Sequence, residues 1–154
     1  MQKITAMAAT CLFTATLVSG TTQTAQAAAG PAWNKTVRCK GTDPSGRHIV
    51  TRIGNAQLGW NHFTHRHNIR VCKIINGAVT DKVDRNDHHG RLEYDGVAVE
   101  NGGTPQRVRF TVIVQYSRLT KDRQYNAGKG QTIGVVNAYC RNQPNNKCPA
   151  WMNK

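Results

Sequence analysis

Apolar and polar residues alternate most regularly in the second half of the chain, over residues 107–116. The apolar side chains stand at every second position from Val108 to Tyr116, a period that places them on one face of a strand. Residues 91–100 and 132–139 also predict strands, and loop-forming segments separate the three. Three consecutive strands joined in this way predict an antiparallel meander.

The first half of the chain has a different spacing. Around residues 54–68 the large apolar side chains include Leu58 and Phe63, and their spacing favours one or two helical turns. Residues 28–40 predict an extended lead-in, and residues 47–53 predict a short strand. Because helical material precedes the meander, the sequence predicts an α+β domain, in which an N-terminal helical segment packs on one face of an antiparallel sheet.

Residues 1–27 have the layout of a secretory signal peptide. A basic start ends at Lys3, an apolar stretch follows, and small residues precede a cleavage site after Ala27. Ala29 is the competing cleavage site. An N-terminal membrane anchor is the alternative, which the short apolar stretch disfavours. The sequence therefore predicts export and leaves residues 28–154 as one secreted, extracellular domain.

Four cysteines remain after removal of the signal peptide, which contains Cys11. An even number of cysteines in an exported chain favours disulfides that stabilise the domain. Four cysteines allow three pairings. We prefer Cys39 with Cys72 and Cys140 with Cys148, because the second pair closes a short turn.

Basic residues outnumber acidic ones, with 21 Lys and Arg against 8 Asp and Glu and a formal charge of +13 at pH 7. Lys3 is the only charged residue of the signal peptide, so the mature part carries +12. Such a charge attracts polyanions, of which nucleic acid, anionic membranes and acidic wall polymers are the candidates. A charge that serves only solubility is the alternative. No mature segment is apolar enough to span a membrane, and we expect a monomer.

Three histidines and one arginine fall within residues 62–67, in the predicted helix. His62 and Arg66 are four residues apart and share one helix face. Imidazole transfers protons near neutral pH, and the planar fork of arginine binds phosphate through two hydrogen bonds. This combination suits cleavage of RNA through its 2′-hydroxyl, a reaction that needs no metal. The alternative is that these residues are ordinary surface side chains.

A zinc site is a second alternative for the histidines. His62, His65 and His67, with His88 and His89, offer enough imidazoles, but zinc sites have a cleaner ligand spacing. The chain has no phosphate-binding glycine loop, nucleophile elbow or metalloprotease helix motif. Its eight acidic residues form no close pair typical of a metal nuclease or glycosidase. We therefore expect neither a metal nor a cofactor.

The predicted strands carry a second group of polar residues. Arg107 and Arg109 are two residues apart and share a strand face, and Tyr139 lies on the last strand. A cleft forms if this face meets the helix that carries the histidines, with Arg109 and Tyr139 as catalytic candidates. Arg107, Lys121 and Lys129 would hold the substrate by charge. A solvated sheet face is the alternative.

Residues 59–63 (GWNHF) and 66–68 (RHN) resemble the His-x-x-x-Arg-His segment of secreted bacterial toxin domains. Those domains belong to the barnase, EndoU, colicin and RelE-like ribonuclease superfamily. Residues 133–140 (IGVVNAYC) are similar to their closing strand. The resemblance extends over roughly residues 54–140 and implies a helix followed by an antiparallel meander.

The resemblance also implies roles for particular residues. It points to His62 and His67 as acid/base candidates, to Arg66 as a phosphate contact, and to Asn137 and Tyr139 on the last strand. The implied activity is a metal-independent endoribonuclease that leaves a 2′,3′-cyclic phosphate and acts as an antibacterial toxin. RNA is the expected partner, and a protein inhibitor is a further candidate partner. The alternative from another class is a noncatalytic cationic secreted protein that binds a polyanion or inhibits another protein.

Overall fold

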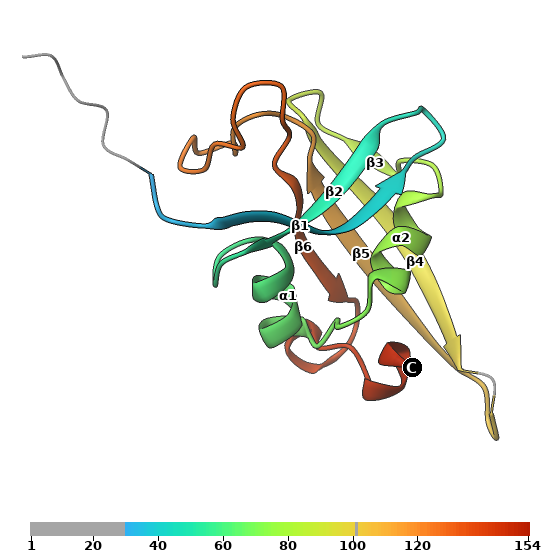
Figure 1. Cartoon of the computed structure of the whole chain (residues 1–154). Coiled ribbons are helices and arrows are strands. Elements are labelled where there is room, and N and C mark those ends of the chain that lie inside the picture. The colour runs from blue at the N-terminus through green and yellow to red at the C-terminus, as the bar shows by residue number, and fades with distance from the viewer. Residues whose placement is uncertain (1–29, 101) are drawn as a thin grey trace, which may run out of the picture.

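The computed structural model describes residues 30–100 and 102–154, so the predicted signal peptide lies outside the described residues. In this part of the chain two strands come first, two α-helices follow, and four further strands precede two short 3-10 helices (Figure 1). In chain order the elements are β1 (Asn34–Thr42), β2 (His48–Gly54), α1 (Gly59–His67), α2 (Cys72–Val79), β3 (Arg85–Asn86), β4 (Arg91–Glu100), β5 (Gln106–Gln115), β6 (Gly134–Cys140), η1 (Pro144–Asn146) and η2 (Ala150–Asn153).

The predicted meander is confirmed as part of a four-stranded antiparallel sheet with the order β3-β4-β5-β6. The short strand β3 extends it by pairing with the start of β4. One face of the sheet carries Val108, Phe110, Val112 and Val114 of β5, all buried. The apolar positions that alternate along the sequence are therefore the side of the strand that faces the core.

Both helices pack against the core. Helix α2 contributes Ile74, Ile75, Ala78 and Val79, and α1 contributes Phe63, whose side chain is fully buried. Figure 1 shows α2 in front of β4 and β5, with α1 nearer β6. No helix among the described residues is both long and apolar enough to cross a membrane.

The α+β class is confirmed, but the prediction of an N-terminal helical segment is wrong, because the helices are central in the chain. A two-stranded antiparallel sheet of β1 and β2 precedes them. Strand β1 occupies most of the predicted lead-in. Within it only Cys39 is buried, so β1 has no apolar alternation that would mark it as a strand. Its pairing with β2 makes it one.

Asp43 fixes the turn of this hairpin to the large sheet. Its Oδ1 accepts hydrogen bonds from the amides of Ser45 and Arg47, and its Oδ2 accepts one from Arg47 Nε at 2.6 Å. The buried hydroxyl of Tyr94 in β4 donates to the same Oδ2 at 2.9 Å. The carboxylate therefore joins a local turn to a strand 51 residues further along the chain.

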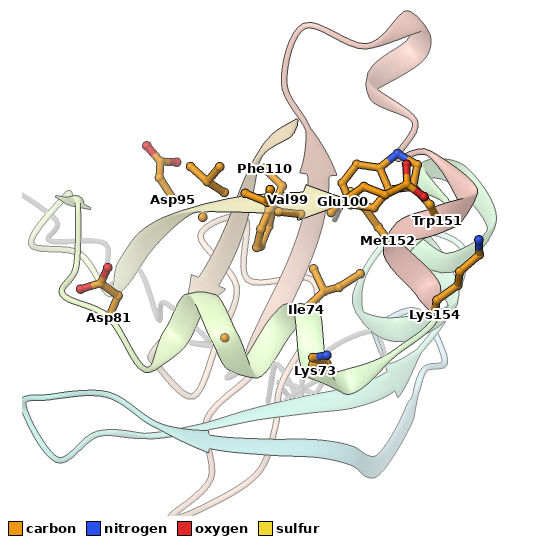
Figure 2. A pocket seen from close by; sticks show the side chains of 14 residues that line it. Lys73, Ile74, Asp81, Asp95, Val99, Glu100, Phe110, Trp151, Met152 and Lys154 are labelled. Carbon is orange, nitrogen blue, oxygen red and sulfur yellow. The ribbon is translucent and has the colours of Figure 1, made fainter. Parts of the chain in front are cut away.

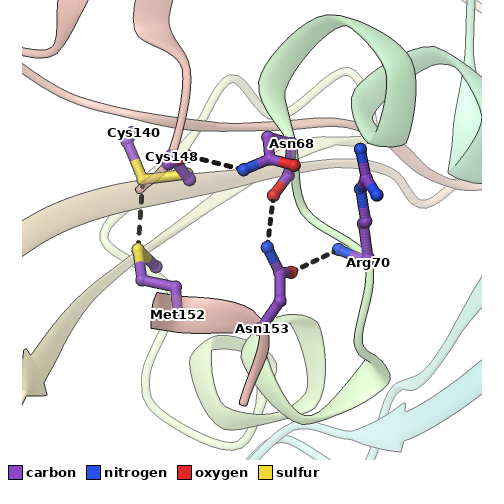
Figure 3. Close-up of a disulfide and its surroundings, with 6 residues drawn as sticks. All are labelled: Asn68, Arg70, Cys140, Cys148, Met152 and Asn153. Carbon is purple, nitrogen blue, oxygen red and sulfur yellow. Dashed lines mark hydrogen bonds between the residues drawn. A yellow bond between two sulfur atoms is a disulfide. The ribbon is translucent and has the colours of Figure 1, made fainter. Parts of the chain in front are cut away.

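The structure has the preferred cysteine pairing, with disulfides Cys39–Cys72 and Cys140–Cys148. The first links β1 to the start of α2. Figure 3 shows the second, which holds the C-terminal segment near the end of α1. There the Asn68 amide donates to the Cys148 carbonyl, and the Asn153 amide donates to the Asn68 carbonyl, both at 2.9 Å.

Candidate functional site

The sheet face opposite the buried residues of β5 carries mostly polar side chains and is here called the outer face. It consists of Arg91, Glu93, Asp95, Val97 and Val99 of β4, Arg107, Arg109, Thr111, Ile113 and Gln115 of β5, and Asn137 and Tyr139 of β6. Asp95 of β4 pairs with Thr111 of β5, and Thr111 pairs with Tyr139 of β6. Directly paired residues share a face and are separated by about 5 Å. The Thr111 hydroxyl donates to Asp95 Oδ1 at 2.7 Å. The three residues therefore form a row across the sheet.

His67 and His62 of α1 extend this row beyond the edge of the sheet. The ring centroid of His67 lies 5.9 Å from that of Tyr139 and 5.7 Å from that of His62. Helix α1 ends at His67 because Asn68 adopts a left-handed backbone with φ 57°, and the Cys148 amide donates to the His67 carbonyl at 2.8 Å. The structure thus brings together three of the predicted catalytic residues.

The backbone fixes the protonation pattern of His62. Its Nδ1 lies 2.8 Å from the carbonyl oxygen of Ala56, and a carbonyl only accepts, so Nδ1 carries a hydrogen. In the neutral ring Nε2 is then the unprotonated nitrogen, which can accept a proton. The His62 side chain is half-buried, so it combines a fixed orientation with access to solvent.

His67 is buried, with 5% of its surface exposed. Burial lowers the pKa of its imidazole, repulsion from His62 and Arg66 adds to the effect, and the backbone of Asn145 and Asn146 partly opposes it. Its Nδ1 has no hydrogen-bond partner among the residues that the structure describes. A neutral, packed imidazole between two candidate reactive groups is suited to hold them in place.

We expect the stability of the protein to fall on acidification because of His67. The pKa of this imidazole lies below 6.5 in the folded chain and returns to about 6.5 on unfolding, so the unfolded chain binds the proton more readily. The neutral His67 imidazole therefore makes its full contribution to the free energy of unfolding above about pH 6.5, and this contribution declines as the pH falls below that value. Urea unfolding at about pH 7.5 and about pH 5 measures the loss in the free energy of unfolding. We expect His67→Gln to lose less stability between these two pH values than the wild type does. Equal losses in both proteins would contradict the expectation.

Arginines and carboxylates form an ion-pair network on the outer face. Arg85 Nε lies 2.5 Å from Glu93 Oε2, and Arg91 Nη2 lies 3.0 Å from Glu93 Oε1. Arg85 also pairs with Asp95, which Arg141 Nη2 approaches to 2.9 Å. Three guanidinium groups thus share two carboxylates.

Sequence reasoning missed this network and found no close acidic pair. The missed signal is the spacing of Glu93 and Asp95, two residues apart on a predicted strand, which puts both on one face. Arg141 lies 46 residues from Asp95, and only the strand register brings them together. The carboxylates are engaged by arginines, so the pair differs from that of a glycosidase, where one carboxyl group has to be protonated.

The other predicted site residues are spread around this row. Arg66 is exposed on α1, and Asn137 pairs with Ile113 in the neighbouring row of the outer face. Arg109 lies opposite Val97, one row beyond Thr111. Lys129 is exposed in the loop before β6.

Two pockets open near opposite ends of β5 on the outer face. The first, of about 360 Å³, is lined by arginines that include Arg107 and Arg109. The second, of about 470 Å³, is lined by Arg91, Gln115 and Lys121 among others. Predicted basic residues thus border the outer face at both ends.

Figure 2 shows a further pocket, of about 710 Å³, between α2, β4 and η2. Lys73 of α2, Val99 of β4 and Trp151 of η2 contribute to its lining. None of the predicted catalytic or substrate-binding residues lines it. Asp95 of the row also lines it, but His62, His67 and Tyr139 do not.

The histidines do not gather in one place. His65 is exposed on α1, with its Nδ1 donating to the Asn61 carbonyl at 2.7 Å, and His88 and His89 are exposed in the turn between β3 and β4. Within residues 30–100 and 102–154, no three His, Cys, Asp or Glu side chains are placed to hold one metal ion.

Comparison with known proteins identifies no relative. No protein-family model, no curated protein and no solved structure matches the chain. A function for the chain therefore rests on the residues of the row and the outer face.

Proposed function

We propose that the chain is a secreted, metal-independent endoribonuclease whose site is the row of His62, His67 and Tyr139. The observation that carries this proposal is the alignment of two imidazoles and a phenol beside an arginine-rich sheet face. Imidazole and phenol both transfer protons, and guanidinium groups stabilise charge on phosphate. The ribonuclease superfamily that the sequence resembles and the role of an antibacterial toxin belong to the same proposal.

His62 is the proposed base, because its Nε2 is free to accept a proton while the Ala56 carbonyl holds Nδ1–H. The 2′ oxygen of RNA gives its proton to Nε2 and forms a bond to phosphorus. The bond from phosphorus to the 5′ oxygen then breaks, and the Tyr139 hydroxyl supplies a proton to that oxygen. The products are a 2′,3′-cyclic phosphate and a 5′-hydroxyl end. His62 then gives its extra proton to solvent, and the Tyr139 oxygen takes one from solvent, which resets the site.

His67 acts as a positioning residue in this scheme. It is too buried to reach a substrate, and its ring packs against both reactive side chains. Its lowered pKa keeps it uncharged, so it does not repel a protonated His62. Arg66, exposed one position earlier on α1, provides positive charge for the reacting phosphate.

The test is incubation of the oxidised, mature protein with mixed RNA in excess EDTA, followed by analysis of product ends. We expect cleavage with 2′,3′-cyclic phosphate ends, and intact single-stranded DNA under the same conditions, since DNA lacks the attacking hydroxyl. A folded sample that leaves RNA intact at low and high salt would reject the ribonuclease.

A noncatalytic cationic binding protein is the second candidate. Its support is the charge of the chain and the exposure of Arg107 and Arg109, which form no ion pair among the described residues. Binding of polyanions that collapses with salt and is accompanied by no turnover would favour this candidate.

A further inference from the structure

Three arginines line the smaller pocket of the outer face. Arg107 and Arg109 come from β5, and Arg141 follows β6, with Asn142 and Gln143 completing the polar lining. Arg141 lies beside Arg109 because its amide donates to the Arg109 carbonyl at 2.7 Å, which continues the antiparallel pairing. We call this group the arginine pocket (Arg107, Arg109 and Arg141).

The three guanidinium groups are held differently. Arg141 donates from Nε to Thr111 Oγ1 at 2.8 Å and from Nη2 to Asp95 Oδ1 at 2.9 Å, so its orientation is set by the row. Arg107 and Arg109 are exposed and form no ion pair within the described residues. The pocket therefore offers one oriented cation and two cations free to pair with an incoming anion.

The arginine pocket lies one row from the proposed reaction site. Arg141 follows Tyr139 by two positions, and two strand residues span about 6.6 Å. Both side chains therefore lie on the same side of the sheet, and a polynucleotide strand that reaches Tyr139 has its neighbouring phosphate within reach of the arginines. The planar fork of arginine suits phosphate oxygens through paired, charge-assisted hydrogen bonds.

We propose that the arginine pocket binds the backbone phosphate that adjoins the cleaved one in an RNA strand. This proposal rests on the proposed ribonuclease function and adds the subsite that fixes the strand on the sheet. The subsite requires at least two linked phosphates, so the substrate is a polynucleotide and not a single nucleotide.

The experiment measures binding of a 5′-fluorescein-labelled octadeoxynucleotide by fluorescence anisotropy at several salt concentrations. This DNA lacks the 2′-hydroxyl, so it binds without being cleaved. The variants are Arg107→Gln/Arg109→Gln and, as a control with the same loss of charge, Lys73→Gln/Lys82→Gln, which changes two exposed lysines outside the arginine pocket. Cleavage of RNA by the wild type is measured in parallel.

We expect the arginine variant to raise Kd by about 10- to 100-fold, and the lysine variant to raise it much less. The slope of log K against log salt should fall by about 0.7 in the arginine variant, which corresponds to one phosphate of a single strand. If both variants raise Kd equally and the wild type still cleaves RNA, the arginine pocket is not the phosphate subsite, and the ribonuclease proposal stands. A specific loss in the arginine variant, with RNA left intact by the wild type, would overturn the ribonuclease and the position of the phosphate beside a cleaved one, and would leave the arginine pocket as a polyanion-binding site.

Discussion

Replacement of His62 by alanine is expected to lower kcat/KM for RNA cleavage by about 10²- to 10⁴-fold. The substitution removes the imidazole that accepts the 2′ proton in the proposed reaction, and it removes the hydrogen bond from Nδ1 to Ala56. The side chain is only half-buried, so the fold should persist. Initial rates on a fluorescent oligoribonucleotide measure the effect, and circular dichroism checks the fold.

His65→Ala is the matched control for this experiment. His65 lies on the same helix and likewise donates from Nδ1 to a backbone carbonyl, that of Asn61, but it is exposed and outside the row. We expect the control to cleave RNA at nearly the wild-type rate. If His62→Ala and His65→Ala have equal activities, His62 is not the base.

Replacement of Asp43 by alanine is expected to lower the free energy of unfolding by about 3 to 5 kcal/mol. The substitution leaves the buried Tyr94 hydroxyl without its acceptor and takes the ion-pair partner from Arg47. It also frees two backbone amides of the turn. Urea unfolding at neutral pH measures the loss.

Asp81→Ala is the control, because Asp81 is exposed and, among the described residues, its side chain accepts a hydrogen bond only from the adjacent Lys82 amide. A much smaller loss is expected there.

Burial raises the pKa of Asp43, but hydrogen bonds from Arg47 and Tyr94 outweigh it and the net pKa is lowered. The stabilisation is therefore present above about pH 3.8 and is lost as pH falls through the folded pKa. If Asp43→Ala and Asp81→Ala lower the free energy of unfolding equally, Asp43 does not have the stabilising role described.

The meander and the first helix were predictable from the sequence because their signals are local. Residues from Val108 to Val114 repeat every two positions, and Phe63 lies in a segment with helical spacing. Burial of one face of a strand or helix imposes its period directly on the chain. The cysteine pairing followed from the same local argument, since Cys140 and Cys148 enclose a short turn.

Strand β1 was not predictable in this way. Its side chains are mostly exposed, and its strand conformation depends on pairing with β2 and on the turn that Asp43 closes. A strand held by backbone hydrogen bonds and a carboxylate leaves no apolar period in the sequence. The position of the helices in the middle of the fold follows from this hairpin.

By itself the sequence determined the strands of the meander, the helix that carries His62 and His67, and the excess of positive charge. Only the tertiary structure decided that Tyr139 lies against His67 and that Arg141 joins Asp95. The physical reason is the sequence separation of the interacting residues. A periodic pattern reflects burial of residues that are close in the sequence, whereas strand register and the packing of α1 on β6 depend on contacts throughout the core. The row and the arginine pocket exist only once that register is set.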